Sequence, residues 1–313
     1  MGRAMRDVFG ETVSDLADGD PRIVVLDGDL ASSTKADIFQ ERHPARFLQM
    51  GIAEQNMMGV AAGLATMGFK PFISTFVSFA VVRPLDQIRV LIAQPRLPVR
   101  ITAGYAGLFT GMAGKTHQIV DDIAIMRAMP QLVTVSPADE VEARQVLAVA
   151  ADHDEGPIYI RLVRDPTQRL FDDGYRFVLG RAVVLRQGSD VTLMSTGTQT
   201  PRVMDAAEIL EAHGIDAHVL HIPTIKPLDE AAIVTAAERT GLVVTVEEHT
   251  VLGGLGGAVA EVLSEHSPQR VRRIGIQDTY GESAPNDALL EKFGLSAARV
   301  AAQVQSMMTL VPA

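Results

Sequence analysis

The sequence contains no cysteine among its 313 residues. This absence excludes a disulfide framework, a thiolate zinc site and a cysteine nucleophile. Uninterrupted apolar runs of membrane-spanning length are also missing: the stretch 77–92 is broken by Arg83, Pro84, Asp86 and Arg89. The first residues, 1–6, lack the apolar core of a signal peptide. We therefore expect a cytoplasmic protein with no membrane partner.

The sequence has fewer basic than acidic residues. Lysine and arginine number 28 against 38 aspartate and glutamate residues, which gives a formal net charge of -10. Because phosphate backbones are bound by basic faces, no nucleic-acid partner is expected, although a local basic pocket for one phosphate is still allowed. With 47% hydrophobic and 21% charged residues, the composition is that of a globular protein long enough for two domains.

Short apolar runs alternate with amphipathic helical patterns along the chain, which is typical of βαβ units and parallel sheets. The expected fold class is α/β, with two consecutive three-layer α/β domains and largely parallel sheets. Polar and turn residues gather before residue 188, which divides the chain into a first domain (1–170), a linker (171–188) and a second domain (189–313). Strands are expected at 23–26, 72–75, 99–103, 132–135, 158–162, 191–195, 217–221, 242–246 and 272–276, and helices near 54–67, 81–93, 138–151, 201–213, 229–239 and 255–265.

Glu54 stands at the start of a predicted helix, after an apolar strand and a turn. A first-turn acid is commonly there for the helix dipole alone, which contributes about 0.3–1 kcal/mol. The alternative is a buried carboxylic acid that exchanges a proton with a cofactor ring, for which an apolar pocket is needed. The pocket could be lined by neighbours in the sequence: Ile52, Ala53, Met57, Met58 and Val60.

Two further features are ambiguous in isolation. Phe76 and Phe79 could stack on a flat heterocycle or could belong to the core. The glycine-rich segment 104–117 presents His117, but it is no Walker A loop because Phe109 takes the place of the first glycine.

The run 253–257 does not fit the dinucleotide fingerprint and predicts a strand-to-helix turn at which backbones approach closely.

Several motifs, taken together and in order, resemble the C-terminal half of transketolases, which are thiamine-diphosphate enzymes. The motifs that carry the resemblance cover nearly the whole chain: Gly51–Asn56, Ser74–Phe76, Thr116–Gln118, Arg127 with Met129–Pro130, Ser136–Asp139, Pro223 with Lys226–Asp229, Glu247–His249, and Asp278 with Gly281–Ser283. The resemblance implies a pyrimidine-binding domain followed by a transketolase C-terminal domain.

The same resemblance implies roles for individual residues. Glu54 matches the catalytic glutamate, Phe79 the residue that stacks on the aminopyrimidine with Phe76 beside it, and His117 a catalytic-site histidine that contacts the sugar. Three other residues match positions that hold the sugar phosphate, namely Arg6, Ser33 and Arg164. Two positions depart from the family pattern: Tyr105 replaces a phosphate-contacting histidine and Ala113 replaces a sugar-contacting aspartate. These departures leave the substrate sugars open.

The family's motif for magnesium and the diphosphate, Gly-Asp-Gly with a downstream Asn, is missing. No metal ligand is therefore expected in this chain, and the resemblance implies that an N-terminal transketolase subunit holds the diphosphate and Mg²⁺ (or Ca²⁺) in an α2β2 heterotetramer. The implied activity is transfer of a two-carbon ketol unit (glycolaldehyde transfer) between sugar phosphates in pentose-phosphate-type carbohydrate metabolism. Alternatives left open are the beta subunit of a 2-oxo acid dehydrogenase, a relative of deoxyxylulose-phosphate synthase, and a non-catalytic interaction subunit.

Overall fold

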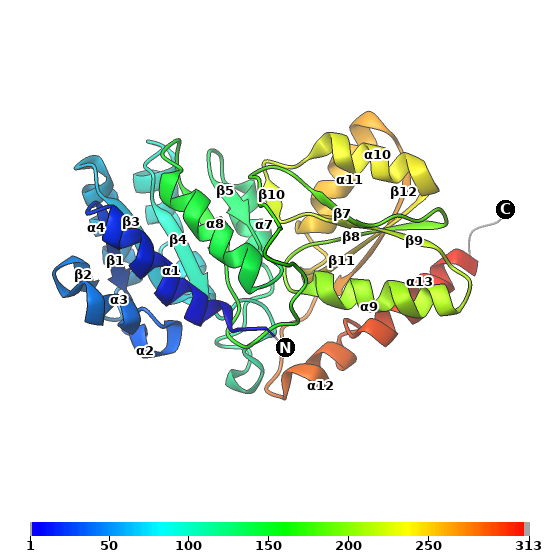
Figure 1. The fold of residues 1–313 in the computed structure, drawn as a ribbon, viewed down its shortest axis with the longest axis horizontal. Coiled ribbons are helices and arrows are strands. Elements are labelled where there is room, and N and C mark those ends of the chain that lie inside the picture. Colours follow the sequence, from blue (N-terminus) through cyan, green and yellow to red (C-terminus); the bar gives the residue numbers. More distant parts are fainter. Residues whose placement is uncertain (1, 310–313) are drawn as a thin grey trace.

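The computed structural model describes residues 2–309 and contains two sheets flanked by helices (Figure 1). The first sheet has seven strands in the order β10-β5-β6-β4-β3-β1-β2 and is parallel except for the antiparallel edge strand β10. Its central strands β1, β3, β4 and β6 are fully buried, as expected of a sheet covered on both faces, and the edge strand β2 is partly exposed. The seven strands are β1 (Ile23–Asp27), β2 (Phe47–Gln49), β3 (Lys70–Phe76), β4 (Arg100–Gly104), β5 (Val133–Val135), β6 (Ile158–Arg161) and β10 (Thr224–Lys226).

Helices of the first unit pack through apolar stripes. Helix α1 (Met5–Gly19) buries Met5, Val8, Phe9 and Val13 and packs along α8 (Glu140–Asp152), while α4 (Glu54–Thr66) packs on β3. The single helix expected over 81–93 is instead divided, because Pro84 cannot donate a helical hydrogen bond. The remaining helical segments are α2 (Ala31–Thr34), α3 (Asp37–Arg42), η1 (Pro44–Arg46), α5 (Val77–Val82), α6 (Leu85–Gln87), the π-helical turn η2 (Ile88–Ala93), η3 (Gly111–Ala113) and α7 (Asp122–Ala128).

The second sheet has five strands in the order β12-β11-β8-β9-β7, with β7 antiparallel at one edge. Helices α9 and α13 pack together on one side of it, and α10 and α11 pack together on the other (Figure 1). The elements are β7 (Val183–Arg186), β8 (Val191–Ser195), α9 (Gln199–Ala212), β9 (Ala217–His221), α10 (Glu230–Thr240), β11 (Leu242–Thr250), α11 (Leu255–His266), β12 (Arg270–Ile276), α12 (Asn286–Lys292) and α13 (Ala297–Thr309).

The expected fold class is confirmed: two three-layer α/β units with largely parallel sheets. The boundaries between them differ in two details from the sequence-based division. Strand β7 lies inside the segment 171–188 that was expected to be a linker, and it pairs with β9. Strand β10 comes from the expected second domain but pairs with β5 of the first sheet. The two units therefore share a hydrogen-bonded edge.

Buried polar contacts add to this interface. The Glu142 carboxylate of α8 lies 2.9 Å from Nε2 of His221 on β9 and accepts a hydrogen bond from the Tyr175 hydroxyl at 2.6 Å. The run 253–257 forms the predicted strand-to-helix turn between β11 and α11, but the group that approaches it closely is a side chain and not a backbone: a Cβ atom on Gly254 would lie 2.1 Å from the Glu247 carboxylate. That carboxylate accepts from the first amides of α11, at Leu255 and Gly256. The Glu142–His221 contact thus joins the two units through a buried, hydrogen-bonded polar pair, and the Glu247 carboxylate satisfies amides within the second unit.

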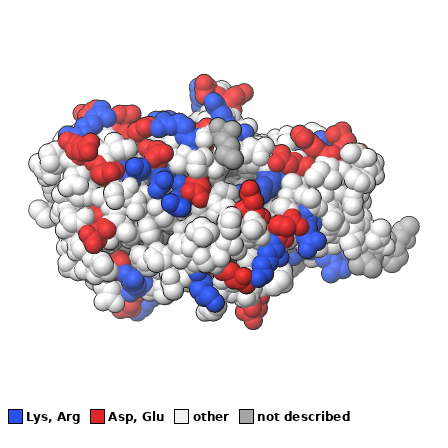
Figure 2. All heavy atoms as spheres, turned by 90° about the horizontal axis from the view of Figure 1, so that it is seen from below, with Lys and Arg blue, Asp and Glu red and all other residues white. Residues whose placement is uncertain are grey.

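On the face shown in Figure 2, acidic and basic side chains alternate in small groups. Among residues 2–309, no helix combines the length and apolar character needed to cross a bilayer.

Candidate active site

The residues singled out in the first unit come from the carboxyl ends of neighbouring strands and from nearby helix starts. Phe76 ends β3, Tyr105 follows β4, and Arg164 follows β6. Because β6, β4 and β3 are adjacent and parallel, these side chains meet at one edge of the sheet. This edge is where open α/β sheets usually bind ligands.

Glu54 is buried at the start of α4, with 4% of its surface exposed. Its Oε1 lies 2.6 Å from Nη1 of Arg83, and the Arg83 guanidinium carbon also lies 4.0 Å from the ring centroid of Phe79. The expected apolar pocket is formed only in part: Met57 and Met58 are fully buried, but Ile52 is 73% exposed. The carboxylate is therefore balanced by an ion pair as well as by apolar neighbours.

Arg83 is a site residue that was not predicted, because in the sequence it stands out only as a charge that interrupts an apolar stretch. A signal for its role was available, because residues four apart on a helix lie on the same face and Arg83 follows Phe79 by four. Its side chain is 44% exposed, so it can leave Glu54 and Phe79 without disrupting the core.

The aromatic residues form a continuous group. The rings of Phe76 and Phe79 are stacked with centroids 5.7 Å apart, and Tyr105 stacks on Phe76 at 3.7 Å. His117 presents its ring edge to both phenylalanines, at 5.9 and 5.5 Å. The structure thus brings His117 together with Phe76 and Phe79, although 38 residues separate Phe79 from His117 in the chain.

The three residues expected to bind phosphate converge on Tyr105. Nη1 of Arg6 donates to the Tyr105 hydroxyl oxygen and to the main-chain oxygen of Ser33, both at 3.2 Å. The Tyr105 hydroxyl donates to the same Ser33 oxygen at 3.4 Å, and the Arg164 guanidinium carbon lies 5.6 Å from the Tyr105 ring centroid. Tyr105 therefore links the two arginines to the aromatic group through Phe76. Ser33 takes part in these contacts through its backbone.

The loop that carries His117 is held by the second unit. The Leu108 amide donates to Oε1 of the buried Glu248 at 2.6 Å, and Gln118 Nε2 donates to the Glu282 carbonyl at 2.9 Å. Gly107 has a φ of 64°, and a Cβ atom there would lie 2.3 Å from Glu248 Oε1. A glycine is required at this position, because a side chain would strain the backbone at this φ and would clash with the Glu248 carboxylate. The C-terminal unit therefore fixes the shape of the loop that carries His117.

We expect Glu248→Ala to loosen this loop, because it leaves the buried Leu108 amide without an acceptor, a loss of about 1–3 kcal/mol. Hydrogen exchange of the full chain should show faster exchange at Leu108 and in the segment 105–117. Glu248→Gln keeps an acceptor oxygen and should largely restore protection. Unchanged exchange at Leu108 in the alanine variant would contradict the proposed anchoring.

This fold and this arrangement of residues define a class of protein, in which a pyrimidine-binding unit precedes a transketolase-type C-terminal unit. A family model described as "Transketolase, pyrimidine binding domain" matches residues 1–168, and one described as "Transketolase, C-terminal domain" matches residues 180–300. The chain belongs to the transketolase family.

Individual relatives agree with this assignment. The chain is 41% identical over 296 residues to a 6-deoxy-6-sulfo-D-fructose transketolase subunit of Clostridium sp. (strain MSTE9), covering 95% of this chain and 92% of the relative. It is 37% identical over 293 residues to a subunit of the apulose-4-phosphate transketolase of Phocaeicola vulgatus, covering 93% of each. A solved structure described as a split gene transketolase, inactive beta4 tetramer, matches with a TM-score of 0.89 and 45% identity over 99% of each chain.

The residues present fit the pyrimidine half of thiamine diphosphate: Arg83 contacts both a buried carboxylate, Glu54, and Phe79 of the stacked Phe76/Phe79 pair. Within the part of the chain that the structure describes, no group of three or more histidine, aspartate or glutamate side chains is placed to hold a metal ion.

Proposed function

We propose that this chain is the C-terminal subunit of a thiamine-diphosphate-dependent transketolase that moves a two-carbon ketol unit from a ketose phosphate to an aldose acceptor. The observation that carries the proposal is the convergence of Glu54, the Phe76/Phe79 pair, His117 and the Arg6/Arg164 pair at one sheet edge. A proton-exchanging acid, a stacking surface and an anion site are the parts that this chemistry needs.

The cofactor, when bound, supplies the nucleophilic carbon for breaking and making the carbon–carbon bond. In this proposal Glu54 holds a proton at a pyrimidine ring nitrogen, and Phe79, with Phe76 beside it, stacks on the ring. Arg83 leaves Glu54 and Phe79 when the ring binds, since it now contacts both of them. His117 donates a hydrogen bond to the transferred fragment and so orients it.

Arg6 and Arg164 bind the anionic end of the substrate, and the Ser33 segment closes this side of the site. The Tyr105 hydroxyl, which accepts a hydrogen bond from Arg6 and donates one to the Ser33 carbonyl, stands in place of the family's histidine. Ala113 is exposed and brings no polar group to the sugar, which favours a substrate that lacks, or does not present, the hydroxyl usually held there. Relatives whose names specify sulfofructose and apulose phosphate are consistent with a substrate other than the common pentose phosphates.

The proposal includes a partner. The chain lacks the Gly-Asp-Gly and Asn pattern, so the diphosphate, with its Mg²⁺ or Ca²⁺, is held by an N-terminal transketolase subunit. The active assembly in this account is an α2β2 heterotetramer with the cofactor between the two kinds of chain.

The test is turnover of this chain mixed with an N-terminal transketolase subunit from the same organism, thiamine diphosphate, Mg²⁺ and a panel of ketose phosphates, sulfo-sugars and aldoses. We expect ketol transfer from the mixture and none from either chain alone. Release of carbon dioxide from pyruvate with no ketol transfer would instead support a 2-oxo acid dehydrogenase beta subunit. A complex that assembles but turns over nothing would support a non-catalytic role.

A further inference from the structure

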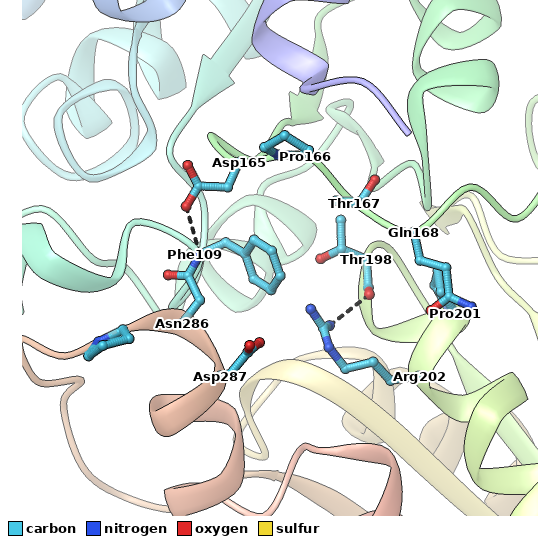
Figure 3. Close-up of a pocket in the computed structure, with 11 residues that line it drawn as sticks. Phe109, Asp165, Pro166, Thr167, Gln168, Thr198, Pro201, Arg202, Asn286 and Asp287 are labelled. Atoms are coloured by element: carbon cyan, nitrogen blue, oxygen red, sulfur yellow. Dashed lines mark hydrogen bonds between the residues drawn. The ribbon is translucent and has the colours of Figure 1, made fainter. Parts of the chain in front are cut away.

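A cavity of about 540 Å³ opens between the two units and is lined in part by Phe109, which lies in the loop that carries His117 (Figure 3). None of the residues assigned above to the cofactor or sugar phosphate lines it. Its walls come from four separate segments: the loop at Phe109, the chain after β6 at 165–168, the start of α9 at Thr198, Pro201 and Arg202, and the start of α12 at 285–287. The volume is that of a small-molecule site.

Arg202 supplies the positive charge of this cavity. Its Nη1 donates to the Thr198 carbonyl at 2.8 Å and to Oε1 of Gln199 at 3.3 Å, and its guanidinium carbon lies 4.6 Å from the ring centroid of Phe109. Within residues 2–309, no carboxylate oxygen lies within 4.0 Å of its nitrogens. Burial lowers the pKa of the Arg202 guanidinium, while the more distant carboxylates of Glu248, Asp287 and Asp205 act in the opposite direction. A partly buried cation of this kind attracts an anion.

A second charge of opposite sign faces the same space. Figure 3 shows the Asp287 carboxylate directed into the cavity from the first turn of α12. Among the described residues, it makes no ion pair with Arg202 or with any other basic side chain. Thr167 also lines the cavity and has a buried hydroxyl oxygen with no hydrogen-bond partner in the described structure. On the opposite wall of the cavity, Asn286 Nδ2 donates a hydrogen bond to Asp165 Oδ2 at 2.6 Å, which joins the start of α12 to the chain after β6.

We propose that this cavity binds a small organic anion that also carries a hydroxyl or ammonium group. The anionic group accepts hydrogen bonds from the free edge of Arg202 and from Thr167, and the hydroxyl or ammonium group donates to Asp287. Phe109 and the neighbouring prolines, Pro166 and Pro201, cover the carbon skeleton between the two ends. Hydroxy acids, amino acids and phosphorylated polyols all have this chemistry.

The position of the cavity links it to the active site. Phe109 belongs to the loop that presents His117, and Asp165 follows the phosphate-binding Arg164 directly in the chain. A ligand held against Phe109 therefore stabilises one arrangement of this loop. By thermodynamic reciprocity, the factor by which this ligand changes the affinity for the sugar equals the factor by which the sugar changes the affinity for this ligand.

The test is a ligand-observed NMR titration of the full chain with three probes: L-lactate, L-serine and glycerol 1-phosphate. We expect saturable binding of at least one probe, weakened about tenfold or more by Arg202→Met, which removes charge-assisted hydrogen bonds but keeps the side-chain stem. Asp287→Asn should weaken binding of L-serine more than binding of L-lactate or glycerol 1-phosphate, because L-serine alone carries an ammonium group that loses an ion pair. Arg272→Met, at an exposed position on β12, is the matched control and should change nothing.

No saturable binding of any probe at millimolar concentration would overturn the proposal, as would binding that both Arg202→Met and Asp287→Asn leave unchanged. If Arg202→Met fails to fold by circular dichroism, Thr167→Val and Asp287→Asn decide the question, since both lie on the cavity wall. The titration requires neither the partner chain nor thiamine diphosphate. Its outcome is therefore separate from the outcome of the ketol-transfer assay.

Discussion

Glu54→Gln should lower turnover of the reconstituted enzyme by about 10²–10⁴-fold, the usual size of a general acid–base contribution. The amide has the same shape as the carboxylic acid but cannot exchange a proton with the pyrimidine ring. The fold should be retained, because Glu54 lies at the start of α4 and its one ionic partner, Arg83, is 44% exposed and can turn to solvent. Steady-state kinetics with saturating cofactor, together with a thermal melt, measure both effects.

A matched control separates catalysis from a helix-start role. Glu230 is also a first-turn acid, at the start of α10, and its side chain is 60% exposed. If Glu54 serves only the helix dipole, Glu54→Gln and Glu230→Gln should have similar small effects on stability and none on rate. Near-normal turnover of the Glu54 variant would remove the catalytic assignment.

Asp122→Ala should destabilise the chain by about 3–5 kcal/mol, the cost of leaving a buried charge without its partner. Oδ2 of Asp122 accepts hydrogen bonds from the Tyr159 hydroxyl at 2.6 Å and from Nε of Arg161 at 2.8 Å, and all three side chains are buried. Arg161 Nη2 in turn donates to the Glu248 carbonyl of the second unit at 3.1 Å. The change therefore weakens the contact between the two units as well as the first sheet.

Urea unfolding of the wild-type chain and the variant measures this effect. Asp86→Ala is the control: it removes the exposed ion pair with Arg89 and should cost no more than about 1 kcal/mol. The double change Asp122→Ala with Arg161→Met should recover part of the loss, because no buried charge is then left alone. Equal effects of Asp122→Ala and Asp86→Ala would show that the buried group contributes no more than a surface pair.

The same group predicts how stability depends on pH. Burial raises the pKa of Asp122, but the adjacent Arg161 guanidinium, His249 and the hydrogen bonds from Arg161 and Tyr159 together outweigh it and hold the pKa below the ordinary aspartate value. Since the folded-state pKa is the lower one, this contribution is fully present above the unfolded pKa of about 4 and is lost as the pH falls through the folded-state pKa. Unfolding measured against pH should therefore show a shallower loss in acid for Asp122→Ala than for the wild-type chain.

The regular elements of the chain were predictable because their signals are local. The strands expected at 191–195 and 217–221 coincide with β8 and β9, and helix α4 was expected within a residue of its ends. Strand β10 was not expected, because a strand of three residues depends on a partner in the other unit rather than on its own pattern. The edge strand β7 is short and flanked by turn residues, so that the local sequence predicts a linker there.

The candidate site was predictable in its members but not in its contacts. The ordered motifs indicated Glu54, Phe79 and His117. The four-residue spacing indicates that Arg83 lies near Phe79, but no sequence pattern indicates that it also contacts Glu54. Tyr105 was identified only as a departure from the family pattern, and its contacts with Arg6 and Phe76 emerge from the packing of β3 against β4. Contacts between side chains distant in sequence depend on the whole fold, which local spacing does not encode.

We propose that the cofactor site is divided between this chain, on the pyrimidine side, and a partner, on the diphosphate side. Calorimetry of thiamine diphosphate with Mg²⁺, performed on this chain alone and on its mixture with an N-terminal transketolase subunit, measures this division. Tight binding is expected in the mixture only. Equally tight binding by this chain alone, or no binding in an assembled mixture, would contradict it.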